Sequence, residues 1–340
     1  MPVEVGKIDR ELKKLWEQDG GAATRASLIN FAVYCEGGHR MAENTELISK
    51  FTQDHACRAI LIASESSAPA QRVQAWISAH CHVSRAGAKQ VCCEQISFLL
   101  EGNSKEMIPS IVFSHLDSDL PLYLWWRGEF SEKIDAQLWT WVDQLIYDSQ
   151  KWKDAKTQFA RLRNSLAEIK PRLTLCDLNW TRLLHFRWAA AQLFDHPTNL
   201  RELQAATRVE ITHAPRHRTT ALLLLGWLMA QLRWKFVAPR PDGFLFRHES
   251  GASIAIELAE SEGAPISHCA IKSPGATFRI THDGSSEFFH GEVELADGGK
   301  YHHLIPSGKN ELLDLLNEEM MRGGKHPIYL KALAAAEPLL

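Results

Sequence analysis

The decapeptide DLPLYLWWRG, residues 119–128, decides the fold that we predict for this chain. Its proline ends any preceding helix and biases the residue before it toward extended backbone. The run at 122–126 is almost wholly apolar and a glycine follows it closely, a pattern typical of a strand buried on both faces. Because open α/β sheets meet ligands at the carboxyl ends of their strands, we expect Trp125, Trp126 and Arg127 at a functional edge.

The composition is that of an ordinary globular protein. The 340 residues suffice for two cores, with 45% apolar and 23% charged residues. The net charge of −3 gives no overall attraction to nucleic acid or to an anionic membrane, so neither is a predicted partner. The polar stretch 1–12 lacks a signal region, and the longest purely apolar run, 221–230, is too short for a bilayer. We therefore expect a cytoplasmic protein.

The first half of the chain alternates apolar runs with helical patterns. We expect a leading helix and linker over 1–25, then a Rossmann-like α/β domain over 26–170 with a mostly parallel sheet. Strands at 26–35 and 58–63 with a helix between them form a βαβ unit. The other elements predicted here are antiparallel strands at 73–81 and 90–100 with Ala86–Gly87 near their turn, helices at 107–116, 134–145 and 152–169, and a short strand at 145–147.

The second half of the chain changes to hairpin patterns. We expect an α+β domain over 171–340, an antiparallel sheet with helices on one side, opened by a helix over 177–194. Asp177 is the favoured N-cap of that helix, and Asn179 is the alternative. The other predicted elements are strands at 203–212, 243–247, 253–258, 268–272, 277–282 and 287–295, hairpin turns at Asp283–Gly284 and Asp297–Gly298, helices at 218–234 and 312–316, and a tail after Pro327.

The sequence lacks the motifs of catalysis and cofactor binding. Gly37 and Gly38, after the first predicted strand, do not have the spacing of a dinucleotide fingerprint, and there is no phosphate-binding loop or nucleophile elbow. We therefore predict no catalytic residue and no cofactor. Asp117, Asp119 and Asp148 are candidates for acid–base work near sheet ends, but turn and cap roles are the favoured interpretation.

Histidines and cysteines give only a weak indication of a metal site. His80 and His82 alternate along one predicted strand, and Cys92 and Cys93 lie on the next. Adjacent strand residues face opposite ways, so these two cysteines are poorly placed to share one ion, and we predict no metal. The seven cysteines are odd in number and irregularly spaced, which argues against a disulfide framework and favours thiols buried in the core.

The segment that begins at Asp177 is the second candidate functional feature. Asn179, Trp180 and Arg182 follow at the start of the predicted helix, where the helix dipole opposes a positive charge. Arg182 therefore needs a specific partner. That partner is either internal, such as Asp177, or the surface of another protein, where Trp and Arg are frequent anchors. Both alternatives stay open on the sequence.

Three stretches resemble the OpcA family, known as the glucose-6-phosphate dehydrogenase assembly protein or accessory subunit: SDLPLYLWWRG at 118–128, CDLNWTR at 176–182 and FRWAAAQLFD at 186–195. The resemblance runs from near residue 25 to the end of the chain. It implies a non-catalytic protein that binds the dehydrogenase and promotes its assembly or allosteric activation. Such a protein acts on the oxidative pentose phosphate pathway and the supply of NADPH.

The resemblance and the two motifs together define the expected partner-binding residues, which are Trp125, Trp126, Arg127, Asp177, Asn179, Trp180 and Arg182. The alternative is a sugar-phosphate-binding protein or enzyme with a pocket near Trp125, Trp126 and Arg182. Aromatic platforms suit sugars and arginines hold phosphates, but no general base or cofactor motif accompanies them. The sequence predicts neither the oligomeric state nor a redox role for any cysteine.

Overall fold

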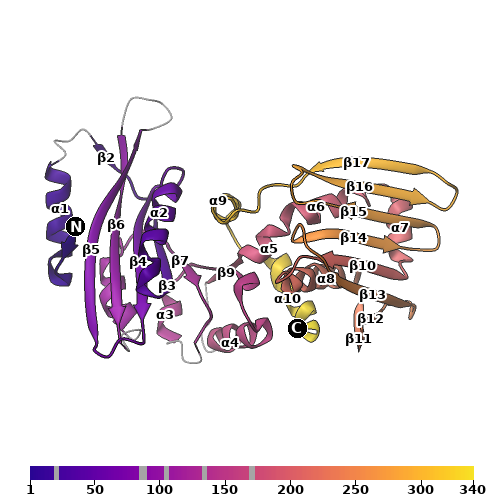
Figure 1. Ribbon diagram of the computed structural model, residues 1–340, viewed down its shortest axis with the longest axis horizontal. Helices are drawn as coiled ribbons and strands as arrows, with labels where there is room; N and C mark the ends of the chain where they lie inside the picture. The colour runs from indigo at the N-terminus through magenta and orange to yellow at the C-terminus, as the bar shows by residue number, and fades with distance from the viewer. Residues whose placement is uncertain (19–22, 84–89, 103–106, 132–135, 168–172) are drawn as a thin grey trace. The chain divides into compact units, whose positions relative to one another are not determined.

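The computed structural model describes residues 1–18, 23–83, 90–102, 107–131, 136–167 and 173–340 (Figure 1). The chain forms two compact units. Unit 1 comprises Met1–Asp148, Thr157–Cys176 and Glu319–Gly324, and unit 2 comprises Ser149–Lys156, Asp177–Glu318 and Lys325–Leu340. The units therefore interleave along the chain. The continuous ranges 1–25, 26–170 and 171–340 stay a prediction.

The sheet of unit 1 contains nine strands within the described residues: β1 (Pro2–Val3), β2 (Ala23–Arg25), β3 (Ile29–Glu36), β4 (Cys57–Glu65), β5 (Arg72–Val83), β6 (Gln90–Glu101), β7 (Leu122–Arg127), β8 (Gln144–Tyr147) and β9 (Thr174–Asp177). Their order is β1-β5-β6-β4-β3-β7-β8-β9, with β2 also paired to β6. The run from β6 through β4, β3 and β7 to β8 is parallel, whereas β5 pairs antiparallel with β6 and with β1.

The centre of this sheet confirms the predicted βαβ unit. The parallel strands β3 and β4 flank helix α2 (Met41–Phe51), and β7 lies on the other side of β3. The antiparallel pair β5–β6 is also confirmed, and it joins the sheet because β6 is parallel to β4. The expected turn at Ala86–Gly87 lies outside the described residues. Apolar runs flanked by turn residues were therefore a sound signal for these buried strands.

The helices of the first half follow the sequence less closely. Helices α1 (Ile8–Gln18) and α4 (Ala155–Ala167) confirm the predictions around them. The predicted helix over 134–145 is wrong in extent: within the described residues, helix α3 covers Ala136–Thr140, and Leu145 belongs to β8. Apolar residues of a short helix and of the next strand share the helical spacing by coincidence. Residues 107–116 form two short turns, Ile108–Val112 and Phe113–His115, rather than a regular helix.

The sheet of unit 2 contains eight strands: β10 (Arg208–His213), β11 (Lys235–Arg240), β12 (Gly243–Arg247), β13 (Ser253–Glu260), β14 (Ile266–Lys272), β15 (Ala276–Thr281), β16 (Phe288–Leu295) and β17 (Lys300–Pro306). Their order among the described residues is β11-β12-β13-β10-β14-β15-β16-β17. All neighbours are antiparallel except β10 and β13. The predicted antiparallel sheet is wrong at that pair, because helix α8 (Arg218–Leu232) and the β11–β12 hairpin carry the chain back in the original direction.

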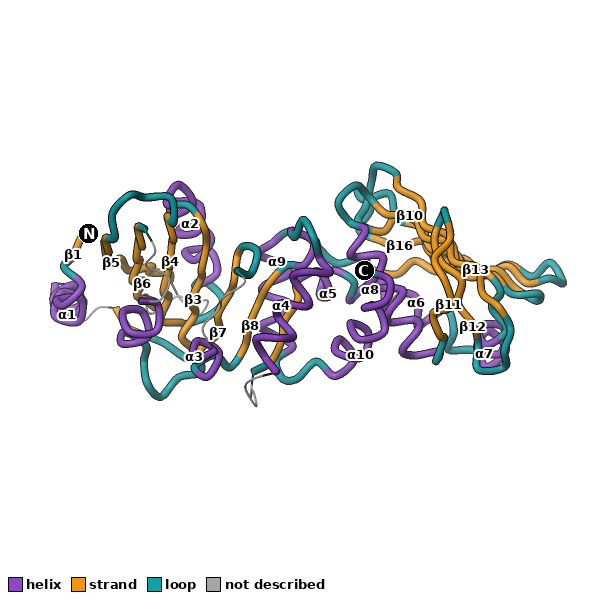
Figure 2. The backbone as a smooth tube through the Cα atoms, turned by 90° about the horizontal axis from the view of Figure 1, so that it is seen from below, coloured by secondary structure: helices purple, strands orange, loops and turns teal. Residues whose placement is uncertain are grey.

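Helices cover one face of the second sheet. Figure 2 shows α6 (Leu184–Gln192) and α8 along one side of its strands. Along β10, Val209, Ile211 and His213 are buried, whereas Glu210 and Thr212, which alternate with them, are partly exposed. The same alternation in β15 and β16 confirms the expected arrangement of helices on one side.

Several elements of unit 2 differ from the prediction. Helix α7 (Pro197–Gln204) was not predicted. It includes Leu203 and Gln204, where the strand predicted over 203–212 was expected to start, and that strand, β10, begins at Arg208 instead. Strands β11 and β17 were not predicted, and the tail after Pro327 is a helix, α10 (Pro327–Ala336). Helix α10 packs so closely on α8 that a side chain at Gly226 would collide with the Ala332 carbonyl and the Ala336 side chain. The remaining helices are α5 (Leu178–Arg182) and α9 (Leu312–Arg322).

Candidate functional site

Strand β7 directs its two tryptophans to opposite faces of the first sheet. Trp125 lies 6.5 Å from Phe31, centroid to centroid, and is 2% exposed. Trp126 stacks on Tyr34 at 3.9 Å and lies 5.5 Å from Phe130. Successive strand residues alternate between faces, so one motif contributes to both layers of the core. Figure 2 shows helices α2 and α3 on the two sides of this sheet.

Arg127 extends the motif along the face that carries Trp125. Its guanidinium lies 4.7 Å above the Trp125 ring and donates hydrogen bonds to the side chains of Asn44 and Glu43 on α2. The Arg127–Glu43 ion pair spans 2.9 Å, with the arginine mostly buried and the glutamate exposed. Arg127 therefore joins the carboxyl end of β7 to helix α2 and contributes a cation–π contact.

Asp177 is the N-cap of α5, as predicted, and the alternative cap Asn179 is excluded. One carboxylate oxygen of Asp177 accepts hydrogen bonds from the backbone N–H groups of Asn179, at 2.9 Å, and Ser149, at 3.0 Å. The other oxygen accepts from the Tyr329 hydroxyl at 3.2 Å. This buried carboxylate connects α5 with the segment at Ser149 and with α10. Each hydrogen bond offsets part of the free-energy cost of burying the carboxylate of Asp177.

Asn179 forms the centre of the same network. Its side-chain oxygen accepts from the hydroxyl of Thr220, on α8, at 2.6 Å and from the Arg182 guanidinium at 3.1 Å. Its amide donates to the Ser149 hydroxyl at 3.0 Å. Asn179 is fully buried, so these bonds determine its side-chain orientation.

Trp180 completes the DLNWTR segment with a stacked cation. The Arg187 guanidinium lies 3.5 Å above the Trp180 ring and donates to the Trp180 carbonyl at 3.4 Å. The Tyr329 ring lies 5.6 Å from Trp180 on the α10 side. Trp180 is 2% exposed, so it is a core residue of unit 2.

The structure thus collects the expected site residues into two internal clusters. Trp125, Trp126 and Arg127 lie in unit 1, and the residues of DLNWTR helix α5 with its Asp177 cap lie in unit 2. Five of the seven side chains are buried, namely Trp125, Trp126, Asp177, Asn179 and Trp180. This burial and the bonds of Arg182 favour the internal-tie alternative over solvent-facing anchors. A partner-binding role for these residues stays a prediction.

The three acidic candidates for catalysis do not form a pair. Asp117 and Asp119 precede β7, whereas Asp148 follows β8. Because β7 and β8 are parallel, these positions lie at opposite ends of the sheet. Asp117 has a turn role: its backbone N–H and carbonyl both bond to the Asn30 side chain at 2.9 Å.

A disulfide joins Cys81 and Cys92, which stand directly opposite each other on β5 and β6. The expectation of core thiols is therefore wrong for these two residues, although the predicted strand pair contained the signal, since it allows this register. The described chain also contains five buried thiols, Cys35, Cys57, Cys93, Cys176 and Cys269. A hydrogen bond from the Cys57 thiol lowers the pKa of Cys93 to about 7.

The histidines of the metal hypothesis have partners within the protein. His80 Nε2 lies 2.7 Å from Gln95 Oε1, and His82 Nε2 lies 3.1 Å from the Thr52 hydroxyl. Cys81 and Cys92 form a disulfide, so neither of these two cysteines is a thiolate ligand in this state.

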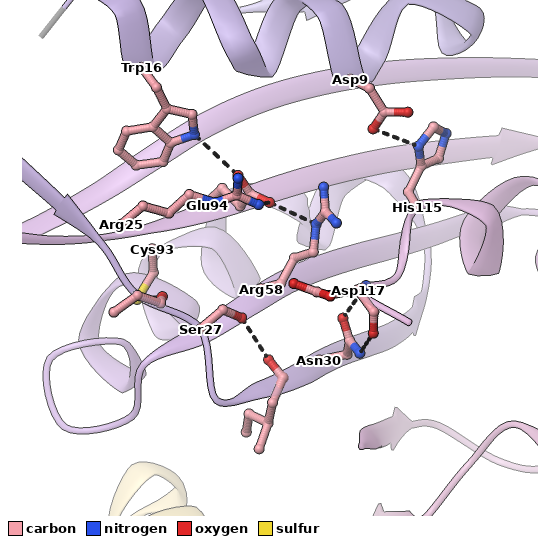
Figure 3. Close-up of polar contacts among 12 residues, drawn as sticks. Asp9, Trp16, Arg25, Ser27, Asn30, Arg58, Cys93, Glu94, His115 and Asp117 are labelled. Carbon is pink, nitrogen blue, oxygen red and sulfur yellow. Dashed lines mark hydrogen bonds and ion pairs between the residues drawn. The ribbon is translucent and has the colours of Figure 1, made fainter. Parts of the chain in front are cut away.

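A buried charged cluster in unit 1 was not predicted (Figure 3). Glu94 of β6 accepts hydrogen bonds from the Trp16 indole of α1 at 3.2 Å and from Arg25 at 2.8 Å, and its carboxylate lies 2.7 Å from the Arg58 guanidinium. The cluster ties α1 to the sheet and pairs a buried charge. A glutamate inside an apolar strand run was the available signal, because such a charge requires partners.

The open face of the second sheet is the other unpredicted feature. A cavity of about 530 Å³ lies over β10 and β13, lined by Glu210, Ile211, Thr212, Asp242, Glu257, Leu258, Ala259 and His268. Burial raises the pKa of Glu210, but Lys272 and Arg208 outweigh burial and the net pKa is lowered. Lys272 lies 2.6 Å from the Glu210 carboxylate. The groove is therefore polar and charge-paired.

These observations define a mixed α/β protein whose conspicuous aromatic and polar motifs stabilise its own fold. The chain belongs to the OpcA family of glucose-6-phosphate dehydrogenase subunits. The family model described as the glucose-6-phosphate dehydrogenase subunit N-terminal domain matches residues 49–164, and the model described as the C-terminal domain matches residues 173–333. The predicted resemblance is confirmed.

Curated relatives carry the same family name. A protein of Synechococcus elongatus described as the OxPP cycle protein OpcA is 29% identical over 206 residues, which are 57% of this chain and 44% of that protein. A relative from Nostoc punctiforme with the same description is 28% identical over 49% of this chain and 36% of its own length. The matched residues thus span less than half the length of these relatives.

Among solved structures, the matches are distant, with TM-scores below 0.5. The aldose–aldose oxidoreductase of Caulobacter crescentus matches with a TM-score of 0.45 and 10% identity over 92% of this chain and 95% of that one. The UDP-N-acetylglucosamine 3-dehydrogenase of Acidithiobacillus ferrooxidans matches with a TM-score of 0.42 and 11% identity over the same shares. Likeness this distant supports no statement about activity. In the described part of the chain, no helix is long and apolar enough to cross a membrane.

Proposed function

We propose that this chain is a non-catalytic, cytoplasmic partner of glucose-6-phosphate dehydrogenase that promotes the assembly of the enzyme or activates it allosterically. The observation that carries the proposal is the pair of consecutive family matches, because both descriptions name a subunit of that enzyme. The description of the relatives as OxPP cycle proteins supports the same pathway, the oxidative pentose phosphate route that supplies NADPH.

The internal chemistry supports a non-catalytic role. The polar groups of Asp177 and Asn179 are engaged by backbone and side-chain partners, so the most distinctive motif of the chain is built as a brace. A general acid or base needs an atom that a substrate can reach. The buried position of Asp177 does not offer one.

Activation follows from linkage if this chain prefers the substrate-ready enzyme. A protein that binds one conformation more tightly shifts the population toward it, and substrate and activator then strengthen each other's binding by the same factor. The test is a calorimetric titration of purified dehydrogenase with this chain, with and without glucose 6-phosphate. Tighter binding with the sugar phosphate supports allosteric activation. Equal affinities leave assembly or turnover as the effect, and an absence of binding contradicts the proposal.

We further propose that the loop after Trp126 and the start of α5 contribute to the enzyme contact through the segments they brace. Arg127→Ala and Arg182→Ala remove one brace each. We expect a lower thermal midpoint, by roughly 2–8 °C, with weaker binding only in proportion to the loss of folded protein. Arg201→Ala is the control, because Arg201 lies exposed on α7.

The opposite result would identify direct anchors. An unchanged midpoint together with an affinity reduced about tenfold or more would mean that Arg127 or Arg182 contacts the enzyme itself. Differential scanning fluorimetry and interferometry on the same samples separate the two outcomes.

A further inference from the structure

Strand β17 is the outermost strand of the second sheet. Figure 1 shows it along one edge, and β16 pairs with it through seven consecutive residues without a bulge. Every residue of β17 except Ile305 is exposed. Among the described residues, no strand pairs with its other side. That side therefore presents a regular row of backbone N–H and C=O groups to solvent.

The opposite edge of the same sheet is protected. Strand β11 contains a bulge between Phe236 and Ala238, carries Pro239, and begins and ends with the charged residues Lys235 and Arg240. Bulges, prolines and charges are the usual means by which proteins block an open edge. The two edges of one sheet therefore differ: β11 is blocked against pairing, whereas β17 is open to it.

The charge on β17 is too small to protect this edge. Its cation, Lys300, pairs with Glu294 of β16 at 2.9 Å, and this glutamate raises the pKa of Lys300. Pro306 stands at the far end of the strand, so it removes one terminal donor rather than a central one.

Apolar side chains gather at the same edge on both faces. Tyr301 is 56% exposed on the face that carries Ile305, and Leu304 is 65% exposed on the opposite face. Phe288, opposite Pro306 on β16, is also exposed. Apolar groups of this size on a free edge are costly to leave in water and favour a covering strand.

We propose that β17 pairs antiparallel with β17 of a second copy of this chain, which joins two eight-stranded sheets into one. The edge of an antiparallel strand is complementary to itself. It presents alternating N–H and C=O groups, and a two-fold axis perpendicular to the sheet sets the N–H groups of one copy against the C=O groups of the other. Directly opposed residues must point their side chains to the same face of the sheet. The two-fold axis therefore sets one residue against the same residue of the other copy, rather than against the residue next to it in the sequence.

The register centred on His303 pairs all seven residues. It sets Tyr301 against Ile305, His302 against Leu304, and Lys300 against Pro306 of the other copy. No lysine opposes a lysine, and each exposed apolar residue gains a cross-strand neighbour. The short contact predicts a weak, concentration-dependent dimer rather than an obligate one.

The first test is the mass of the full chain in solution. Sedimentation at about 1–100 μM should show a reversible monomer–dimer equilibrium. Leu304→Lys adds a charge that blocks the edge, and it should raise the dimer Kd about tenfold or more. Val237→Lys is the matched control on β11, where the replaced side chain is 39% exposed, and it should leave the equilibrium unchanged. A monomer at every concentration overturns the proposal, as does an equal effect of the two variants.

Cross-linking gives the register. Under mild oxidation, His303→Cys should form an intermolecular disulfide much faster than Val237→Cys, because a residue on the two-fold axis faces itself. Faster reaction of His302→Cys instead supports edge pairing in the neighbouring register. Cross-linking of neither variant above the control overturns the proposal.

The inference does not depend on the proposed enzyme partner. Hydrogen exchange of the β17 amides separates the two. Protection that rises with the concentration of this chain alone supports self-pairing. Protection that appears only with added dehydrogenase overturns the self-pairing but leaves the enzyme partnership standing.

Discussion

The two sheets bury their side chains in different ways. In the first sheet, β3 and β4 are buried along most of their length, and β7 directs a tryptophan into each layer. In the second sheet, β10, β15 and β16 alternate buried residues with partly exposed ones. The two sheets therefore leave different surfaces exposed to solvent. The conspicuous aromatic motif is used by the core, whereas the inconspicuous second sheet keeps a face and an edge in solvent.

Their charged groups differ in the same sense. Glu94 of the first sheet is buried between arginines, whereas Arg279 of the second sheet pairs with Glu292 at 3.1 Å and Glu294 at 3.5 Å while all three stay partly exposed. Exposed pairs contribute little to stability. Charges on the open face are therefore available to orient a partner, which is the usual effect of surface charge on association.

The largest effect that we expect is from truncation of the buried aromatic motif. Trp125→Ala should lower the free energy of unfolding by about 3–5 kcal/mol, because it leaves a cavity beside Phe31 and removes the surface on which Arg127 stacks. Leu304→Ala on the open edge should change the free energy of unfolding by less than about 0.5 kcal/mol. Chemical denaturation followed by circular dichroism measures both.

Trp141→Ala is the control for the removal of an indole as such, because Trp141 in the same unit is more than half exposed. Equal losses at Trp125 and Trp141, or a large loss at Leu304, would break the contrast between the buried and the open sheet.

The sequence predicted the elements that bury continuous or alternating apolar residues. Strand 58–63 and helix 218–234 were found because their patterns are long and uninterrupted. Edge strands β11 and β17 were missed because exposed strands have no apolar period to detect. Helix α10 was missed because a proline at the first helical position resembles the start of a tail.

The candidate site was predictable only where it depends on residues close together in the sequence. The N-cap role of Asp177 depends on local backbone geometry, which sequence patterns encode. Its bond to Tyr329 joins residues 152 positions apart, and Ser149 and Thr220 are also distant in sequence. Such tertiary partners carry no local signal, so the sequence alone left open the choice between an internal brace and a surface anchor.

An intermediate effect is expected from the disulfide, which closes one hairpin and has no counterpart in the β16–β17 hairpin. Reduction should lower the stability of unit 1 by about 2–3 kcal/mol, the chain-entropy value for a short loop. Cys81 and Cys92 are 11 residues apart. Unfolding midpoints measured with and without reductant should differ in the wild type and coincide in Cys81→Ser. A reductant-independent wild-type midpoint would contradict the role of the bond.

The smallest effect is a pH dependence that belongs to the first sheet. His115 is buried, stacks on Phe98 at 5.8 Å, and has its Nδ1 3.7 Å from an Asp9 carboxylate oxygen. Burial lowers the pKa of His115, and Arg58 adds to the decrease, while Asp9 opposes it. In the unfolded chain the group titrates near its ordinary pKa of 6.5.

The sign of this dependence follows from proton binding. Just below pH 6.5, His115 binds a proton in the unfolded chain but stays neutral in the folded protein. The contribution of neutral His115 to the free energy of unfolding is therefore complete above pH 6.5 and is lost as pH falls through the pKa of the folded state. His115→Gln should therefore flatten the decrease in unfolding free energy below pH 6.5, whereas His302→Gln, at an exposed position on β17, should not. Asp9→Asn removes the group that raises the folded pKa, so the decrease should extend to lower pH. Identical pH profiles for the wild type and His115→Gln would show that burial of this imidazole does not couple to folding.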